Sequence, residues 1–272
     1  METLSKPLDA PTQENADVAR AGALILNADD WGRDQETSNR IFDCVKRHTV
    51  SSVSAMVFME DSQRSSEMAR EAKVDAGLHL NFTTRFSAPG VPAKLGQAQS
   101  KIGDYLLRRR FNSAVFHPGL IGDFEYVIAA QLEEFQRLYG IAPKRVDGHH
   151  HMHLCANVLF RGLLPGGTVA RRNFSFQPGE KSWINRQYRQ VVDRALARRH
   201  RLTDYFFSLP PLEPQSRLER IRELAEDFVV EVETHPVKAD EYRFLMEDGV
   251  VRWKKDLPIA SHFAVCVSKT VC

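Results

Sequence analysis

A dense cluster of histidines lies in the middle of this chain. Four of its ten histidines fall within segment 147–153, whose sequence is DGHHHMH. The segment follows Val146, a short apolar step that is typical of the end of a strand. Histidine is the commonest metal ligand and changes charge near neutral pH, so the cluster indicates metal binding, proton transfer or both. An expression tag would lie at a terminus, whereas this run is central.

Carboxylates and histidines also follow other predicted strands. Asp29 and Asp30 come directly after the apolar run 23–26, and His235 follows the β-branched run 228–234. Because the carboxyl ends of parallel strands meet at one edge of a sheet, we expect these side chains and the cluster to gather there. One carboxylate with two imidazoles leaves metal positions open for water and substrate, as in catalytic sites. A second carboxylate can then act as general base, and a histidine opposite it can act as acid.

Strand geometry restricts how the two aspartates can cooperate. Consecutive residues of a strand point to opposite faces, so Asp29 and Asp30 can share one site only where the chain leaves the extended form. Gly32, two residues later, permits such a turn. The sequence therefore predicts a departure from regular strand geometry at this point.

The histidines obey the same restriction. On the predicted strand 78–82, His79 and Asn81 share one face, which would point into a barrel. In the cluster, an extended chain groups His149, His151 and His153, whereas a helix that begins there pairs His149 with His153. Spacing alone does not select among these histidines.

Strand and helix patterns alternate along the chain. Predicted strands cover 23–26, 50–59, 78–82, 168–171, 205–209 and 228–234, and predicted helices cover 35–47, 61–73, 123–139 and 183–201, with a further helix opening at the capping box 216–219. The weakly patterned stretch 83–120 is predicted to be a lid-like insertion outside the core. This alternation favours a single α/β domain, a (β/α) barrel, over an open doubly wound sheet, because the Rossmann glycine fingerprint is absent.

Composition excludes several classes of protein. The formal charge of +2 is too small to indicate nucleic-acid binding, and no stretch approaches the roughly 20 apolar residues that cross a bilayer. Four cysteines without CxxC spacing are typical of reduced thiols in a cytoplasmic protein. Residues 1–21 are polar and lack the apolar region of a signal peptide, so we expect a flexible tail. Composition leaves homo-oligomer formation open.

Four ordered segments resemble the motifs of the YdjC-like family of carbohydrate deacetylases. They are 27–32 (NADDWG), 77–81 (GLHLN), 147–153 (DGHHHMH) and 231–236 (EVETHP), and the resemblance runs from about residue 23 to residue 235. It implies a deacetylase domain over 22–272, with 83–120 inserted, folded as a distorted (β/α) barrel related to the NodB-type deacetylases. The implied reaction is hydrolysis of an N-acetyl group from an amino sugar with one divalent metal ion, Mg or Zn.

The resemblance also implies roles for individual residues. Asp29 matches the catalytic base, and His235 matches the acid or base near the leaving nitrogen. The metal ligands match three positions, Asp30, His79 and His149.

Further positions are candidates for substrate binding. Trp31 stands where the family usually has phenylalanine, and an arginine at 171 or 172 falls near a family arginine, of which we assign Arg172. The candidates are Trp31, Asn81, His151, His153 and Arg172. His150 is expected to face away from the site.

Two other classes remain open from the sequence. A metal-dependent phosphoesterase or another amidohydrolase could use the same aspartates and histidines, with arginines binding phosphate. A catalytically silent sugar-binding protein could keep the fold and the histidines. The second carboxylate argues against a silent protein, because a pure binding site has no need of one that does not bind the metal.

Overall fold

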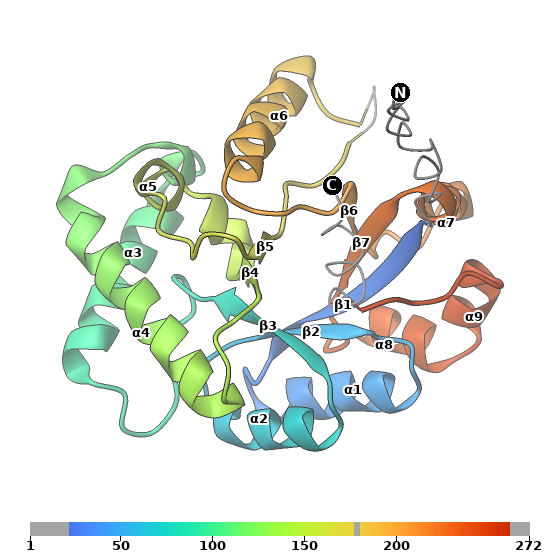
Figure 1. Cartoon of the computed structure of the whole chain (residues 1–272), viewed down its shortest axis with the longest axis horizontal. Coiled ribbons are helices and arrows are strands. Elements are labelled where there is room, and N and C mark those ends of the chain that lie inside the picture. The colour runs from blue at the N-terminus through green and yellow to red at the C-terminus, as the bar shows by residue number, and fades with distance from the viewer. Residues whose placement is uncertain (1–21, 177–179, 262–272) are drawn as a thin grey trace, which may run out of the picture.

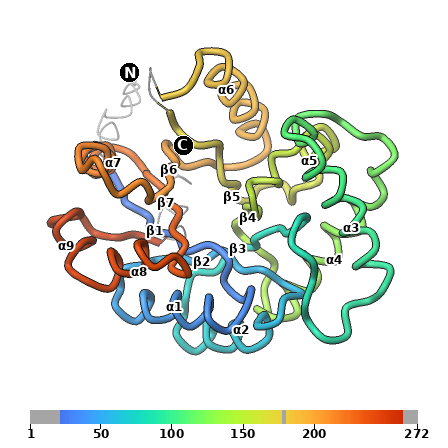
Figure 2. The backbone as a smooth tube through the Cα atoms, turned by 180° about the vertical axis from the view of Figure 1, so that it is seen from behind, coloured from blue at the N-terminus to red at the C-terminus, as the bar shows by residue number. Residues whose placement is uncertain are grey.

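The structure is a computed structural model that describes residues 22–176 and 180–261. The predicted tail 1–21 and the cysteines at 266 and 272 lie outside these ranges. One parallel sheet organises the described chain, and helices surround it (Figures 1 and 2).

The sheet contains seven strands within the described ranges, in the order β5-β4-β3-β2-β1-β7-β6. Every pairing is parallel. The strands are β1 (Ala23–Trp31), β2 (Ser52–Ala55), β3 (Asp75–Leu80), β4 (Arg145–Gly148), β5 (Val169–Ala170), β6 (Tyr205–Ser208) and β7 (Val229–Thr234). Parallel pairing brings their carboxyl ends to one edge, as the sequence predicts.

The sheet curls so that its edge strands approach each other. The backbone N–H of Ala170 in β5 donates to the carbonyl of Arg201, 3.0 Å away, just before β6. The N–H of Ser175 donates to the carbonyl of Phe206 in β6 at 2.8 Å. These bonds replace a continuous ladder between the edge strands, so the fold is the predicted distorted barrel.

Helices connect the strands and cover the outside of the sheet (Figure 1). They are α1 (Gln35–Lys46), α2 (Ser62–Glu71), α3 (Ala93–Arg108), α4 (Ile121–Tyr139), α5 (Ala156–Arg161), α6 (Trp183–Ala197), α7 (Gln215–Asp227), α8 (Ala239–Met246) and α9 (Gly249–Lys254). Asp34 caps α1 by accepting from the N–H of Thr37, and Gly140 ends α4 with φ 74°. The predicted capping box is wrong, because α7 begins earlier, after Pro214, without a side-chain cap.

The inside of the barrel changes from apolar to polar along β1. Every residue of β1 is buried, which parallel strands covered on both faces require. Leu24, Leu26 and Ala28 belong to the main core beneath the helices. Ala23 and Ile25 pack with Val229 of β7 in a separate small cluster. Beyond that cluster, the alternate positions of β1 carry polar side chains, and these begin the candidate site.

The stretch 83–120 differs from the expected lid-like insertion. It contains α3, whose buried positions Leu95, Ile102 and Leu106 join the main core, and Figure 1 shows α3 beside α4. A Cβ at Gly103 would lie 3.0 Å from the carbonyl oxygen of Phe82, so this glycine permits α3 to pack closely there. The expectation of a non-core element is therefore wrong.

The described helices differ in length or polarity from a helix that spans a membrane. Within residues 22–176 and 180–261, every helix is too short or too polar to cross a bilayer.

Neighbouring leucines of α3 test its place in the core. Leu106 is 4% exposed and Leu107 is 57% exposed. Leu106→Ala should lower the free energy of unfolding by about 2–4 kcal/mol, because it leaves a cavity, whereas Leu107→Ala should change it by less than about 0.5 kcal/mol. Urea denaturation of both variants measures the difference. Equal small effects would mean that α3 is a loosely attached lid.

Candidate active site

The two aspartates at the carboxyl end of β1 both reach one site. Asp29 and Asp30 are each 2% exposed. Asp30 has φ 70°, and the register between β1 and β2 shifts between Ala28 and Trp31. Because the chain leaves the extended form here, the carboxylate of Asp30 points to the same side as that of Asp29. The two aspartates can therefore share one site.

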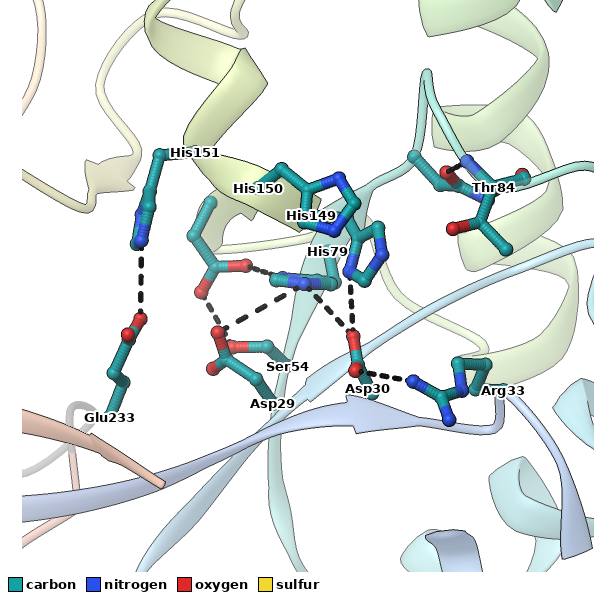
Figure 3. A network of polar contacts seen from close by, with 12 residues as sticks. Asp29, Asp30, Arg33, Ser54, His79, Thr84, His149, His150, His151 and Glu233 are labelled. Atoms are coloured by element: carbon teal, nitrogen blue, oxygen red, sulfur yellow. Dashed lines mark hydrogen bonds and ion pairs between the residues drawn. The ribbon is translucent and has the colours of Figure 1, made fainter. Parts of the chain in front are cut away.

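Two histidines, His79 of β3 and His149 just after β4, converge on Asp30 (Figure 3). Oδ1 of Asp30 lies 2.8 Å from Nδ1 of His149 and 3.4 Å from Nε2 of His79. One ligand atom from each residue lies within 4.8 Å of the others. A zinc ion about 2 Å from each ligand would separate neighbouring ligand atoms by roughly 3–4 Å, so the spacing fits one ion.

The environment of Asp30 supports the same interpretation. Within the described residues, its buried Oδ1 accepts no hydrogen bond of regular geometry, although two imidazole nitrogens lie close. Burial opposes ionisation of Asp30, but His149 and His79 outweigh it and hold the pKa well below its usual range. Its other oxygen, Oδ2, pairs with Arg33 at 3.1 Å. An ionised carboxylate with one oxygen directed at two imidazoles is suited to a metal ion.

Asp147 orients His79 from behind. Its Oδ1 lies 2.7 Å from Nδ1 of His79, which leaves Nε2 for the cavity. The parallel register of β3 and β4 pairs these two residues directly. Ser54 donates to Oδ2 of Asp147 at 2.6 Å, and Arg145 donates to the same oxygen at 2.8 Å. A carboxylate behind a metal-binding imidazole fixes its tautomer and raises its basicity.

A buried arginine, Arg171, holds Asp29, the aspartate that is not a candidate ligand. Arg171 donates to Oδ2 of Asp29 at 2.6 Å and to Oδ1 at 2.8 Å. Asn27 also donates to Oδ1 of Asp29, at 2.7 Å. Burial raises the pKa of Asp29, but the charge of Arg171 outweighs it and lowers the pKa to about 2. Asp29 is therefore an ionised acceptor, 4.0 Å from Nε2 of His79.

The histidine cluster forms an irregular turn rather than a strand or a regular helix. It lies in the 3₁₀ segment His149–Leu154, in which His150 and His151 have φ 54° and 57°. This backbone directs three consecutive histidines to a cavity of about 500 Å³, which Asp29, Asp30, His79, His149, His150, His151, Glu233 and His235 help to line. The expectation that His150 faces away is wrong, because its ring lies 4.0 Å from that of His149.

His235 lies on another wall of this cavity, after β7. Its backbone N–H donates to Glu241 of α8 at 2.8 Å. Within the described residues, its buried Nδ1 has no hydrogen-bond partner. The imidazole therefore shares the cavity with Asp29 and the three candidate ligands, while its backbone is held from behind.

The family model described as YdjC-like protein matches residues 23–260. The chain belongs to this family.

Individual relatives extend the comparison. The chain is 26% identical over 134 residues to a chitooligosaccharide deacetylase of Proteus mirabilis, covering 49% of this chain and 51% of that protein. It is 30% identical over 138 residues to a carbohydrate deacetylase of Mus musculus, covering 50% and 44%. The chain thus spans about half the length of the curated relatives it matches.

One solved structure has the same fold. It comes from Enterococcus faecalis V583 and was provisionally assigned to cellobiose-phosphate cleavage. The TM-score is 0.61 at 17% identity, over 89% of this chain and 97% of that chain. At this identity the similarity shows the fold alone.

Several predicted substrate-binding residues lie outside the cavity. Trp31 is fully buried in the core, where its ring packs 6.3 Å from that of Phe42. Asn81 is also fully buried and accepts from the N–H groups of Thr83 and Thr84, so it shapes the turn after β3. These positions correct the expectation that Trp31 and Asn81 contact substrate directly.

Two further candidates are also displaced from the cavity. His153 is buried, and its Nε2 lies 2.9 Å from the carbonyl oxygen of Arg171. Arg172 binds Asp193 at 3.0 Å, so it faces away from the site. The site arginine is Arg171 and not Arg172, because consecutive residues of an extended chain point to opposite sides. Of the weaker candidates, only His151 lines the cavity.

Sequence reasoning assigned no role to Asp147 or Glu233. Asp147 stands two residues before His149, and the pairing of β3 with β4 could have placed it beside His79. Glu233 of β7 stands two residues before His235, which follows the strand, and both side chains line the cavity. In both cases a carboxylate stands two positions before a histidine of the site, and this spacing could have indicated its place beside the cavity.

The contact between Asp147 and His79 gives a test of the candidate metal site. Asp147→Asn should weaken binding of Zn²⁺ or Mg²⁺ by about 10–100-fold, because an amide orients His79 without raising its basicity. Calorimetric titration of the metal-free protein measures this affinity. Thermal unfolding in EDTA controls for loss of the fold, since Asp147 also pairs with Arg145. Unchanged affinity in a folded variant would remove Asp147 from the metal site.

Protonation of His79 gives a second test. Burial lowers its pKa, but the charge of Asp29 and the bonds with Asp147 and Asp30 raise it to about 10 in the metal-free protein. A metal ligand must be deprotonated, so protons compete with the ion below that pH. Apparent metal affinity should rise with pH by about tenfold per unit until about pH 10, with about one proton released per ion. Titration near neutral pH in buffers of different ionisation enthalpy counts the protons, and a count of zero would contradict this.

Proposed function

We propose that this chain is a metal-dependent hydrolase that removes an N-acetyl group from an amino sugar or oligosaccharide. The observation that carries the proposal is the convergence of Asp30, His79 and His149 beside a second, ionised carboxylate, Asp29, in a cavity that His235 also lines. The names of the bacterial and mouse relatives support the same substrate class.

The candidate ligands suit one divalent ion. Asp30, His79 and His149 offer one oxygen and two nitrogens. Zinc and other transition ions accept this mixed set readily, whereas magnesium usually prefers oxygen ligands, and the proposal includes both Mg and Zn. When bound, the ion would polarise the acetamide carbonyl and make a bound water more acidic.

The protein's own groups handle the protons. Asp29, fixed by Arg171, accepts a hydrogen bond from the attacking water and then its proton as the C–O bond forms. His235 in its protonated form donates to the amide nitrogen as the C–N bond breaks. The products are acetate and a free amine. Because the pKa of Asp29 is about 2, this carboxylate orients the water and holds the proton only briefly.

The remaining expectations concern the cellular setting. Cys44 and Cys155 are free and buried, which agrees with the proposed cytoplasmic location. We propose an N-acetylated sugar as the substrate, and we leave homo-oligomer formation open.

The adjacent aspartates provide a matched test of the mechanism. Asp30→Asn should abolish metal binding and acetate release together, because Asp30 is a candidate ligand. Asp29→Asn should keep metal affinity within a few-fold while lowering kcat for acetate release from diacetylchitobiose by about 10²–10⁴-fold. His235→Ala should lower kcat by a similar factor and should also keep the metal.

Three measurements decide between these outcomes. They are acetate release, bound metal per chain and unfolding temperature, each recorded for every variant. Wild-type rates from both Asp29→Asn and His235→Ala would overturn the mechanism. Phosphate release without acetate release from phosphorylated N-acetyl sugars would favour a phosphoesterase instead.

A further inference from the structure

A carboxylate that the proposed mechanism does not use lies inside the cavity. Glu233 of β7 is 4% exposed and lines the cavity that contains Asp29 and His235. Within the described residues, its buried Oε2 accepts no hydrogen bond. A buried carboxylate oxygen without a donor is costly, so a native protein that keeps one needs a reason for it.

Two groups lie at ion-pair distance from this oxygen but form no hydrogen bond with it. Nε2 of His151 lies 3.6 Å from Oε2 of Glu233, and Nη1 of Arg171 lies 3.5 Å from it. The first gap is too long for a direct hydrogen bond, and a gap of this kind is commonly bridged by a third polar atom. Figure 3 shows Glu233 and His151 facing each other on one side of Asp29, with Asp30 and His149 on the other side.

The ring of His151 is held rigidly toward this gap. Its centroid lies 4.6 Å from that of Phe174 and 5.8 Å from that of Phe206, and both contacts are edge-on. Phe174 and Phe206 stack on each other at 4.7 Å. The backbone of His151 also adopts the left-handed region, which costs a non-glycine residue about 1–3 kcal/mol and is often found at functional sites. Packing and backbone thus hold the imidazole where a ligand would need it.

We propose that Glu233 and His151 form a subsite that binds a ring hydroxyl of the N-acetyl sugar and so determines which sugars are accepted. A hydroxyl both donates and accepts, so it can bridge the carboxyl group and the imidazole in either protonation state. Burial and the charge of Asp29 raise the pKa of Glu233 well above its usual range, which adds the ability to donate. This inference rests on the proposed function for the identity of the sugar.

The position of the pair relates it to the reacting group. One nitrogen of Arg171, Nη1, lies 2.6 Å from Oδ2 of Asp29 and 3.5 Å from Oε2 of Glu233. The two carboxylates are therefore neighbours, and a sugar whose acetamide lies at Asp29 presents its own ring hydroxyls toward Glu233. Buried groups that hydrogen-bond a substrate hydroxyl reject analogues that lack it, since those leave the groups unpaired.

Kinetics with matched variants tests the proposal. Glu233→Ala should raise KM for diacetylchitobiose by about 10–100-fold while kcat stays within about threefold. Glu233→Gln keeps the size and hydrogen-bonding ability of the side chain, so it should restore most of the lost affinity. Glu219→Gln, on the exposed face of α7, is the control for a simple change of charge.

Deoxy sugars identify the contact itself. With 3-deoxy, 4-deoxy and 6-deoxy analogues of the acetylated residue, one analogue should show the same KM with the wild type and with Glu233→Ala. Equal effects of the substitution on all three analogues, or a loss confined to kcat, would overturn the proposal. Calorimetric binding of diacetylchitobiose to the metal-free protein gives a readout that does not need turnover. Absence of acetate release from every substrate would refute the proposed function alone, whereas unchanged sugar affinity in Glu233→Ala would refute the subsite.

Discussion

The interaction on which this site depends is the burial of one guanidinium among carboxylates. Arg171 is 1% exposed and pairs with Asp29, Glu231 and Asp147, at distances from 2.6 to 3.4 Å. Removing one partner of such a group leaves an uncompensated buried charge, which typically costs 3–5 kcal/mol. Because these carboxylates come from β1, β4 and β7, one cation fixes the relative position of three strands at their carboxyl ends.

The same residue connects the two halves of the site. Its backbone carbonyl accepts from His153, which anchors the end of the histidine cluster, while its side chain keeps Asp29 ionised. Asp147, also within reach of Arg171, orients His79 toward the cavity. The candidate metal ligands and the proposed base are therefore coupled through Arg171, although Arg171 is assigned neither role itself. Guanidinium suits this position because it stays charged and donates in several fixed directions.

The sequence predicted the barrel, approximate ranges for six of the seven described strands and the end of the seventh near Val146, and the convergence of Asp29, Asp30, His79, His149 and His235 in one region. Alternating patterns and the positions of polar residues after strands carry this information directly. It did not predict Arg171 over Arg172, because choosing between adjacent residues requires knowing which face of a two-residue strand turns inward. It also missed α3, because Pro89, Gly90 and Pro92 indicate a loop just before it, and the close packing of Gly103 against Phe82 is known only from the structure.

The largest difference between sequence and structure lies in the backbone at two short turns. Regular strand geometry would place Asp29 and Asp30 on opposite faces, and it would direct His150 away from His149 and His151. Left-handed conformations at Asp30, His150 and His151 instead bring consecutive side chains to one cavity. Each such residue costs about 1–3 kcal/mol, and surrounding contacts must offset that cost. The ion pair of Asp30 with Arg33 and the packing of His151 against Phe174 are contacts of this kind. Residue types thus define which chemistry is available, whereas strained turns, held by their neighbours, determine which residues can take part in it.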